Sequence, residues 1–118
     1  MNPVTLTQLE KAHGLHFLSP QCLQLDIGHR QAVQAILAQQ LPHAQVFAFG
    51  SRVSGTPRKY SDLDLAIIMP QPLSLRTLSQ LKTSFEDSDI PICIDLVDWQ
   101  QADPDFKTAV AAQGVVAL

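Results

Sequence analysis

Two aspartates, Asp62 and Asp64, interrupt the apolar segment SDLDLAIIM at residues 61–69. Residues two apart in a strand point to the same face, so we expect the two carboxylates side by side and the leucines beside them in the core. Carboxylates this close repel each other, and a divalent cation is the usual remedy. Because all the ligands would be oxygens, the pattern favours Mg²⁺ or Mn²⁺. The ordinary alternative for this spacing is a solvated turn or strand edge.

A third aspartate, Asp95, lies in a second apolar segment, ICIDLV at residues 92–97. Strand alternation places its side chain on the face away from its apolar neighbours. If this segment pairs beside the strand that carries Asp64, the acids converge. Two alternatives stay open, namely Asp95 as a cap or rim residue and Asp98 as the acid that completes the group.

A glycine followed by a serine, Gly50 and Ser51, ends another strand-like segment, AQVFAFG. A glycine before a helical turn exposes backbone N–H groups that can cradle a phosphate, and the hydroxyl adds a donor. Arg52, Arg58 or Lys59 would balance further phosphate charge, although an ion pair with one of the acids is the alternative for Arg52. Acids that hold metal opposite donors that hold phosphate form the minimal apparatus for phosphoryl or nucleotidyl transfer.

A small set of helices and strands must position these groups. Their order predicts an α/β (α+β) sandwich in which helices pack on a small mixed sheet. We expect an N-terminal appendage over residues 1–20 and a single domain over residues 21–118. The expected elements are a helix from a cap at Asp26 to Gln40, strands over 44–50 and 61–69, a helix after a cap at Ser74, a strand over 91–99 and a helix over about 103–113.

Composition limits the partners. At 118 residues the chain fits one domain. Eight lysines and arginines against eleven aspartates and glutamates give a formal charge of −3. A negative net charge disfavours stable binding of a long nucleic acid. The absence of a long apolar run and of a leader predicts a cytoplasmic protein with no membrane partner. Cys22 and Cys93 stand among apolar residues and are predicted to be buried, reduced thiols.

With these residues in place, the sequence resembles the minimal nucleotidyltransferases of the DNA polymerase β superfamily. The signature of that family is G-S, a short basic loop with a glycine, S-D-x-D-L, and a third acid on a later strand. The likeness runs from about Ile27 to the C-terminus and implies a palm-like fold. One departure is Ser54, which stands where members often carry a basic residue before the loop glycine. The matching residues are Gly50, Ser51, Arg52, Gly55, Ser61, Asp62, Asp64, Leu65 and Asp95.

The resemblance also implies a specific role for each of the matching site residues. Asp62 and Asp64 would bind two Mg²⁺ ions, and Asp95 would join one of them and help to activate an acceptor hydroxyl. The triphosphate of ATP would be held by the glycine-serine turn, together with Arg52 and Ser61.

Small bacterial members of this kind resemble the antitoxin half of a toxin–antitoxin pair whose partner is a HEPN-domain ribonuclease. The reaction implied is transfer of AMP from ATP to a tyrosine of the toxin. About twenty residues follow Asp95, so we expect the acceptor to be supplied in trans. Two alternatives remain, a non-catalytic antitoxin that neutralises by binding and an adenylyltransferase for a small molecule. The sequence does not determine whether the chain forms a homo-oligomer or whether it uses a nucleotide other than ATP.

Overall fold

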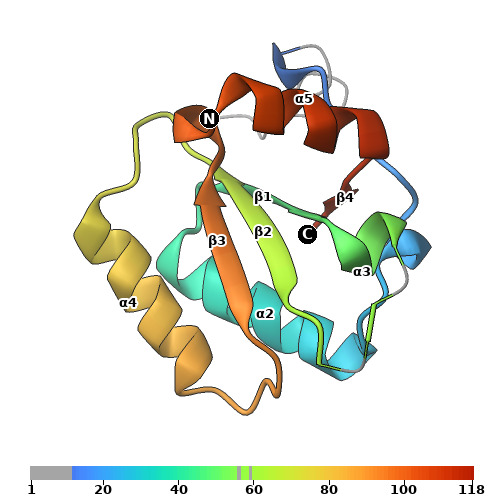
Figure 1. Cartoon of the computed structure of the whole chain (residues 1–118). Helices are drawn as coiled ribbons and strands as arrows, with labels where there is room; N and C mark the ends of the chain where they lie inside the picture. Colours follow the sequence, from blue (N-terminus) through green and yellow to red (C-terminus); the bar gives the residue numbers. More distant parts are fainter. Residues whose placement is uncertain (1–11, 56, 59) are drawn as a thin grey trace.

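The computed structural model describes residues 12–55, 57–58 and 60–118, and these residues form one four-stranded sheet in the order β3-β2-β1-β4 (Figure 1). Strand β1 is antiparallel to both β2 and β4, whereas β2 and β3 run parallel. The predicted small mixed sheet is therefore confirmed. The strands are β1 (Gln45–Phe49), β2 (Leu63–Ile68), β3 (Ile94–Asp98) and β4 (Val116–Ala117).

Helices α2 (Ile27–Gln40) and α4 (Leu75–Glu86) cover one face of the sheet. Each begins at its predicted cap, Asp26 or Ser74, whose side chain accepts a hydrogen bond from a backbone N–H of the first turn. None of the helices in the described part of the chain is long and apolar enough to cross a membrane. The buried side chains of this layer include Val33, Leu37, Leu63, Leu65, Ile67, Leu81 and Phe85.

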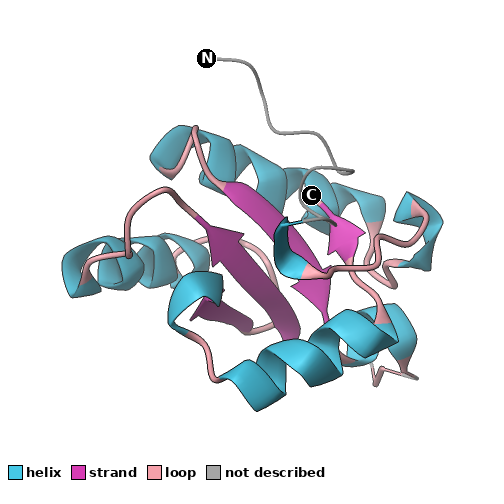
Figure 2. Ribbon diagram, turned by 90° about the horizontal axis from the view of Figure 1, so that it is seen from above, coloured by secondary structure: helices cyan, strands magenta, loops and turns pink. Residues whose placement is uncertain are grey.

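Helix α5 (Pro104–Gln113) and the 3-10 helix η2 (Trp99–Gln101) lie against the opposite face, so that helices stand on both sides of the sheet (Figure 2). Val110 of α5 is buried in a second apolar cluster. In the same cluster the ring centroids of Trp99 and Phe47 lie 5.0 Å apart. The last predicted helix is therefore confirmed.

The first eleven residues of the expected N-terminal appendage lie outside the described part of the chain. After them, Leu15 is buried in the same cluster as Trp99, and Phe17 forms a β-bridge with Val115. A 3-10 helix, η1 (Pro20–Cys22), follows. This segment therefore packs beside β4, a strand that sequence reasoning did not foresee because two residues are too few to show alternation.

The two cysteines are less buried than predicted. Cys22 is partly buried, Cys93 is exposed, and both are free thiols. Cys93 lies just before β3, where its backbone carbonyl accepts a hydrogen bond from the Leu63 N–H at 3.0 Å. The apolar residues on either side of Cys93 face inward, so alternation turns its own side chain toward solvent.

Candidate active site

Asp64 and Asp95 are direct neighbours across the parallel strands β2 and β3. Their side chains share a hydrogen bond, and Asp64 is half-buried. Burial, followed by the charges of Asp95 and Asp62 and by the hydrogen bond, raises the pKa of the Asp64 carboxyl from 3.8 to about 6. The structure therefore brings Asp64 and Asp95 together, as expected if their strands are adjacent.

Asp62 lies one residue before β2 with an exposed side chain, close enough for its charge to act on Asp64. Within the described residues, no three His, Cys, Asp or Glu side chains already stand in an arrangement that could hold a metal ion. The donor set nevertheless fits Mg²⁺, because it consists of carboxylates, and because burial and then the repulsion from Asp95 and Asp62 raise the pKa of Asp64. A divalent cation would offset this repulsion, with Asp62, Asp64 and Asp95 as its candidate ligands.

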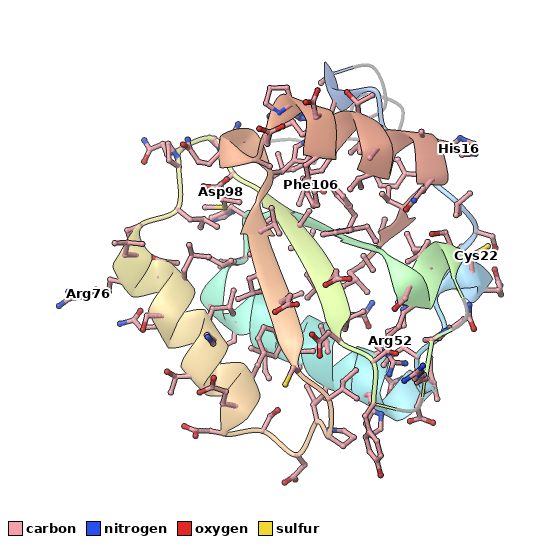
Figure 3. The ribbon with its side chains drawn as sticks, viewed as in Figure 1. His16, Cys22, Arg52, Arg76, Asp98 and Phe106 are labelled. Carbon is pink, nitrogen blue, oxygen red and sulfur yellow. The ribbon has the colours of Figure 1, made fainter. Side chains whose placement is uncertain are left out.

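Asp98, the competing candidate for the third acid, ends β3 and makes a different contact (Figure 3). Its Oδ2 accepts a hydrogen bond from the Leu73 N–H at 2.9 Å. It lies three positions after Asp95, an odd offset, so the two side chains leave the strand on opposite faces. Asp98 thus ties the segment before α4 to the end of β3, and Asp95 is the acid that meets Asp64.

The turn after β1 brings the backbone against the acids. Phe49 is opposite Asp64 in the register of β1 and β2, and Gly50 then adopts a φ of +81° before the short helix α3 (Ser51–Ser54). A Cβ on Gly50 would overlap Oδ2 of Asp64 and lie 3.3 Å from its Cγ. Glycine is therefore required both by the left-handed backbone and by the carboxylate. Ser51, predicted to contact phosphate, is exposed at the start of α3.

Arg52, predicted to contact phosphate, is only 7% exposed. Its Nε donates a hydrogen bond to the Ser61 carbonyl at 3.0 Å, and its Nη1 donates one to the Gln24 carbonyl at 2.8 Å. The guanidinium, which is labelled in Figure 3, thus ties α3 to the residue before Asp62 and to the segment before α2. Sequence reasoning missed this positioning contact, because nothing in the sequence separates a buried arginine from an exposed one here. A phosphate contact from Arg52 stays a prediction.

Ser61 closes the turn that leads into β2. Its Oγ accepts a hydrogen bond from the Arg58 N–H at 2.8 Å, and its own N–H donates to the Arg58 carbonyl at 3.1 Å. Because Arg52 also holds its carbonyl, Ser61 is anchored immediately before Asp62. Its predicted contact with nucleotide stays a prediction, and Lys59 lies outside the described residues.

A polar hollow of about 570 Å³ lies elsewhere, between α2 and α4 on the layer that covers the other face of the sheet. It offers no charge to a metal ion or a phosphate, because all its lining residues are neutral. They are Gln40, Thr77, Ser79, Gln80, Thr83 and Ser84.

The family described as polymerase beta, nucleotidyltransferase, matches residues 31–118, a span that contains the acids, the glycine-serine turn and all four strands. The chain belongs to this family. As a nucleotidyltransferase domain it has the mixed sheet and flanking helices that the sequence predicted, with Asp64 and Asp95 on neighbouring strands.

Relatives of this nucleotidyltransferase domain include antitoxins. The probable protein adenylyltransferase MntA of Haemophilus influenzae is 45% identical over 95 residues, which are 79% of this chain and 83% of that protein. A crystal structure of the toxin–antitoxin pair MntA–HpeT has a TM-score of 0.63 at 25% identity, over 80% of this chain and 72% of that one. A structure of a tri-AMPylated Shewanella oneidensis HEPN toxin in complex with an MNT antitoxin shares the fold. Its TM-score is 0.52 at 22% identity, over 75% of this chain and 67% of that one.

One residue near the acids of the nucleotidyltransferase was missed altogether. Phe106 of α5 is 38% exposed, and its ring meets that of Phe49 edge-on, with the centroids 5.6 Å apart and the planes at 81°. Phe49 is the residue opposite Asp64. The sequence shows Phe106 four residues before Val110, which is the spacing of one helix face, but it does not show that this face meets the acid side of the sheet.

Proposed function

We propose that the chain transfers AMP from Mg·ATP to a hydroxyl of a protein partner, a tyrosine of a HEPN-domain toxin, and so acts as its antitoxin. The observation that carries the proposal is the facing pair of Asp64 and Asp95 beside the Gly50 turn, in a chain 45% identical to a probable protein adenylyltransferase. We place this activity in the cytoplasm.

The reaction is a displacement at the α-phosphorus of ATP. The tyrosine oxygen forms a bond to phosphorus, the bond to the bridging oxygen of the β-phosphate breaks, and pyrophosphate leaves with that oxygen. Asp95, exposed on β3, accepts the proton of the tyrosine hydroxyl. Bound Mg²⁺ would neutralise the triphosphate and the charge that develops on the leaving group.

The other residues position the donor. Asp62 and Asp64 would hold the ions against the triphosphate, and the backbone N–H groups after Gly50 would bind phosphate oxygens. Arg52 keeps both parts in place, because its guanidinium links α3 to the residue before Asp62.

Variants of the three acids test the proposal against neutralisation by binding alone. We expect Asp62→Asn, Asp64→Asn and Asp95→Asn each to abolish AMP transfer while the complex with the partner persists. Asp62→Asn and Asp64→Asn would also lose metal-dependent ATP binding, whereas Asp95→Asn would keep much of it, since its task belongs to the transition state. The matched control is Asp98→Asn, which changes an acid of the same strand that is tied to Leu73 instead.

Mass spectrometry of the purified HEPN partner after incubation with Mg·ATP would count AMP additions, and growth of cells that co-express both proteins would report neutralisation. If all three variants neutralise as well as the parent chain, the antitoxin works by binding alone. Transfer to a small hydroxyl compound without modification of the partner would instead support a small-molecule acceptor.

A further inference from the structure

Phe106 is an apolar side chain that the fold leaves partly exposed. It lies one helical turn before Val110, which is buried, so both residues belong to the face of α5 that meets the sheet. Phe106 nevertheless keeps 38% of its surface exposed, although its ring already rests on Phe49. The ring therefore combines a fixed position with an accessible surface.

The place of this ring relative to the acids follows from strand register. Phe49 is opposite Asp64 in the antiparallel pair of β1 and β2, and opposite residues point to the same face with their Cβ atoms about 5 Å apart. Phe49 is also the residue directly before Gly50. The aromatic pair of Phe106 and Phe49 thus stands beside both the acid group and the turn proposed to bind phosphate.

The order of the strands shows whether the acceptor or the nucleotide is the better ligand for the aromatic pair of Phe106 and Phe49. Asp95, which would activate the acceptor hydroxyl, lies on β3, whereas Phe49 lies on β1, on the other side of the strand that carries Asp64. An acceptor side chain directed at Asp95 approaches from the β3 side. The aromatic pair is on the opposite side of β2 from Asp95, away from this approach.

We propose that Phe106 is the platform for the base of the nucleotide, and that it favours a purine over a pyrimidine. This inference rests on the proposed function, because it assumes that the nucleotide binds across the acids and the Gly50 turn. Contacts to phosphate are the same for every nucleoside triphosphate and select no base. A purine offers a wide π-face to an exposed phenyl ring, and base–aromatic stacking adds affinity that inorganic phosphates cannot gain.

The test compares two ligands that share the phosphate part. Calorimetry with Mg·ATP and with Mg·tripolyphosphate is run on the parent chain and on Phe106→Leu, which keeps an apolar contact with Phe49 but removes the π-face. We expect Mg·ATP to bind about tenfold more weakly to the variant, and Mg·tripolyphosphate to change by less than about twofold. Phe106→Trp should retain affinity for ATP. The matched control is Leu75→Ala, which removes an apolar side chain that is 85% exposed on α4.

Thermal melts without ligand identify any variant that fails to fold, and the preference of the parent chain for ATP over CTP should narrow in Phe106→Leu. Unchanged affinity for Mg·ATP in that variant overturns the inference, as does an equal loss for both ligands. A raised KM for the protein acceptor with unchanged ATP affinity would assign the ring to the acceptor and also overturn it. A parent chain that binds ATP with this selectivity but transfers no AMP overturns the proposed function and leaves the base platform standing.

Discussion

Asp64 and Asp95 are partners in the register of two parallel strands, and their carboxyl groups share a hydrogen bond. This hydrogen bond requires a proton, which Asp64 holds up to about pH 6 because of its burial and the charges nearby. A divalent cation can take the place of that proton. The ionised acids are therefore unfavourable in the free protein, and a bound cation would stabilise them.

The burial of Asp64 and its repulsion by Asp95 and Asp62 predict how stability depends on pH in the absence of metal. Because the pKa of Asp64 is raised from 3.8 to about 6, the folded chain holds a proton there that the unfolded chain releases. The free energy of unfolding in EDTA should therefore fall as pH rises from about 4 to 6, and level off above that range. The full shift would correspond to about 3 kcal/mol, which solvent screening of this half-buried group reduces to about 1 kcal/mol.

Urea unfolding in EDTA at several pH values measures this slope for the parent chain and for Asp64→Asn. The variant should lack the contribution of this carboxyl and be the more stable protein at pH 7.5. Mg²⁺ should raise the stability of the parent chain and do little for the variant. Parallel pH profiles for the two proteins would contradict the predicted origin of the slope.

A comparison of Gly50 with Gly14 distinguishes the cost of backbone strain from the cost of a collision with a carboxylate. Both have positive φ, but a Cβ on Gly14 meets no atom within 4 Å, whereas one on Gly50 would overlap Asp64. Gly14→Ala should cost about 1 kcal/mol and Gly50→Ala at least about 2 kcal/mol. In an Asp64→Ala background the cost of Gly50→Ala should fall, leaving only the cost of the backbone conformation at Gly50. If it does not fall, the carboxylate is not the obstacle.

Arg52 should matter more for folding than its place in a basic loop suggests. Arg52→Ala leaves two backbone carbonyls without their guanidinium partner and should lower the free energy of unfolding by about 2–4 kcal/mol. Arg52→Lys should recover little of this, because an ammonium lacks the planar fork that reaches both carbonyls. The control, Arg58→Ala, changes an exposed residue and should stay within about 0.5 kcal/mol. Unaltered unfolding with lost ATP affinity in Arg52→Ala would instead indicate a phosphate ligand.

Substitution of Asp98 should lower stability and not AMP transfer, whereas substitution of Asp95 should lower AMP transfer and not stability. Asp98→Ala removes the acceptor of the Leu73 N–H and should cost about 1–3 kcal/mol while transfer per folded molecule is kept. Asp95→Ala removes an exposed carboxylate that repels Asp64, so it should not lower the free energy of unfolding, and it should abolish transfer. Chemical unfolding and the mass-spectrometric assay of the partner measure the two effects separately. Loss of transfer in folded Asp98→Ala would point to Asp98 as the acid of the reaction.

Local rules predicted much of this fold. The caps at Asp26 and Ser74 and the alternation that places Asp64 on one strand face are properties of a few neighbouring residues, so the sequence shows them directly. The meeting of Asp64 with Asp95 required one further assumption, that their strands are adjacent, and the order of the sheet confirms it.

Features that depend on tertiary packing were not predicted. The burial of Arg52 follows from carbonyls far along the chain, at Gln24 and Ser61, and the contact of Phe106 with Phe49 depends on where α5 crosses the sheet. The exposure of Cys93 is different, because alternation with its two apolar neighbours explains it, and the prediction of burial considered only their composition. Arg52 and Phe106 are thus each placed by a partner that sequence spacing does not reveal.

In the described sheet, β3 is an edge strand that pairs only with β2. Any local opening that peels this edge away carries Asp95 out of reach of Asp64, and the repulsion between the two acids favours such opening. A ligand that binds both carboxylates would link β3 to β2 and stabilise the edge of the sheet. Amide hydrogen exchange in β3 should therefore slow when Mg·ATP binds, more than exchange in β1, so that the backbone of five residues reports occupancy of the site independently of any chemistry.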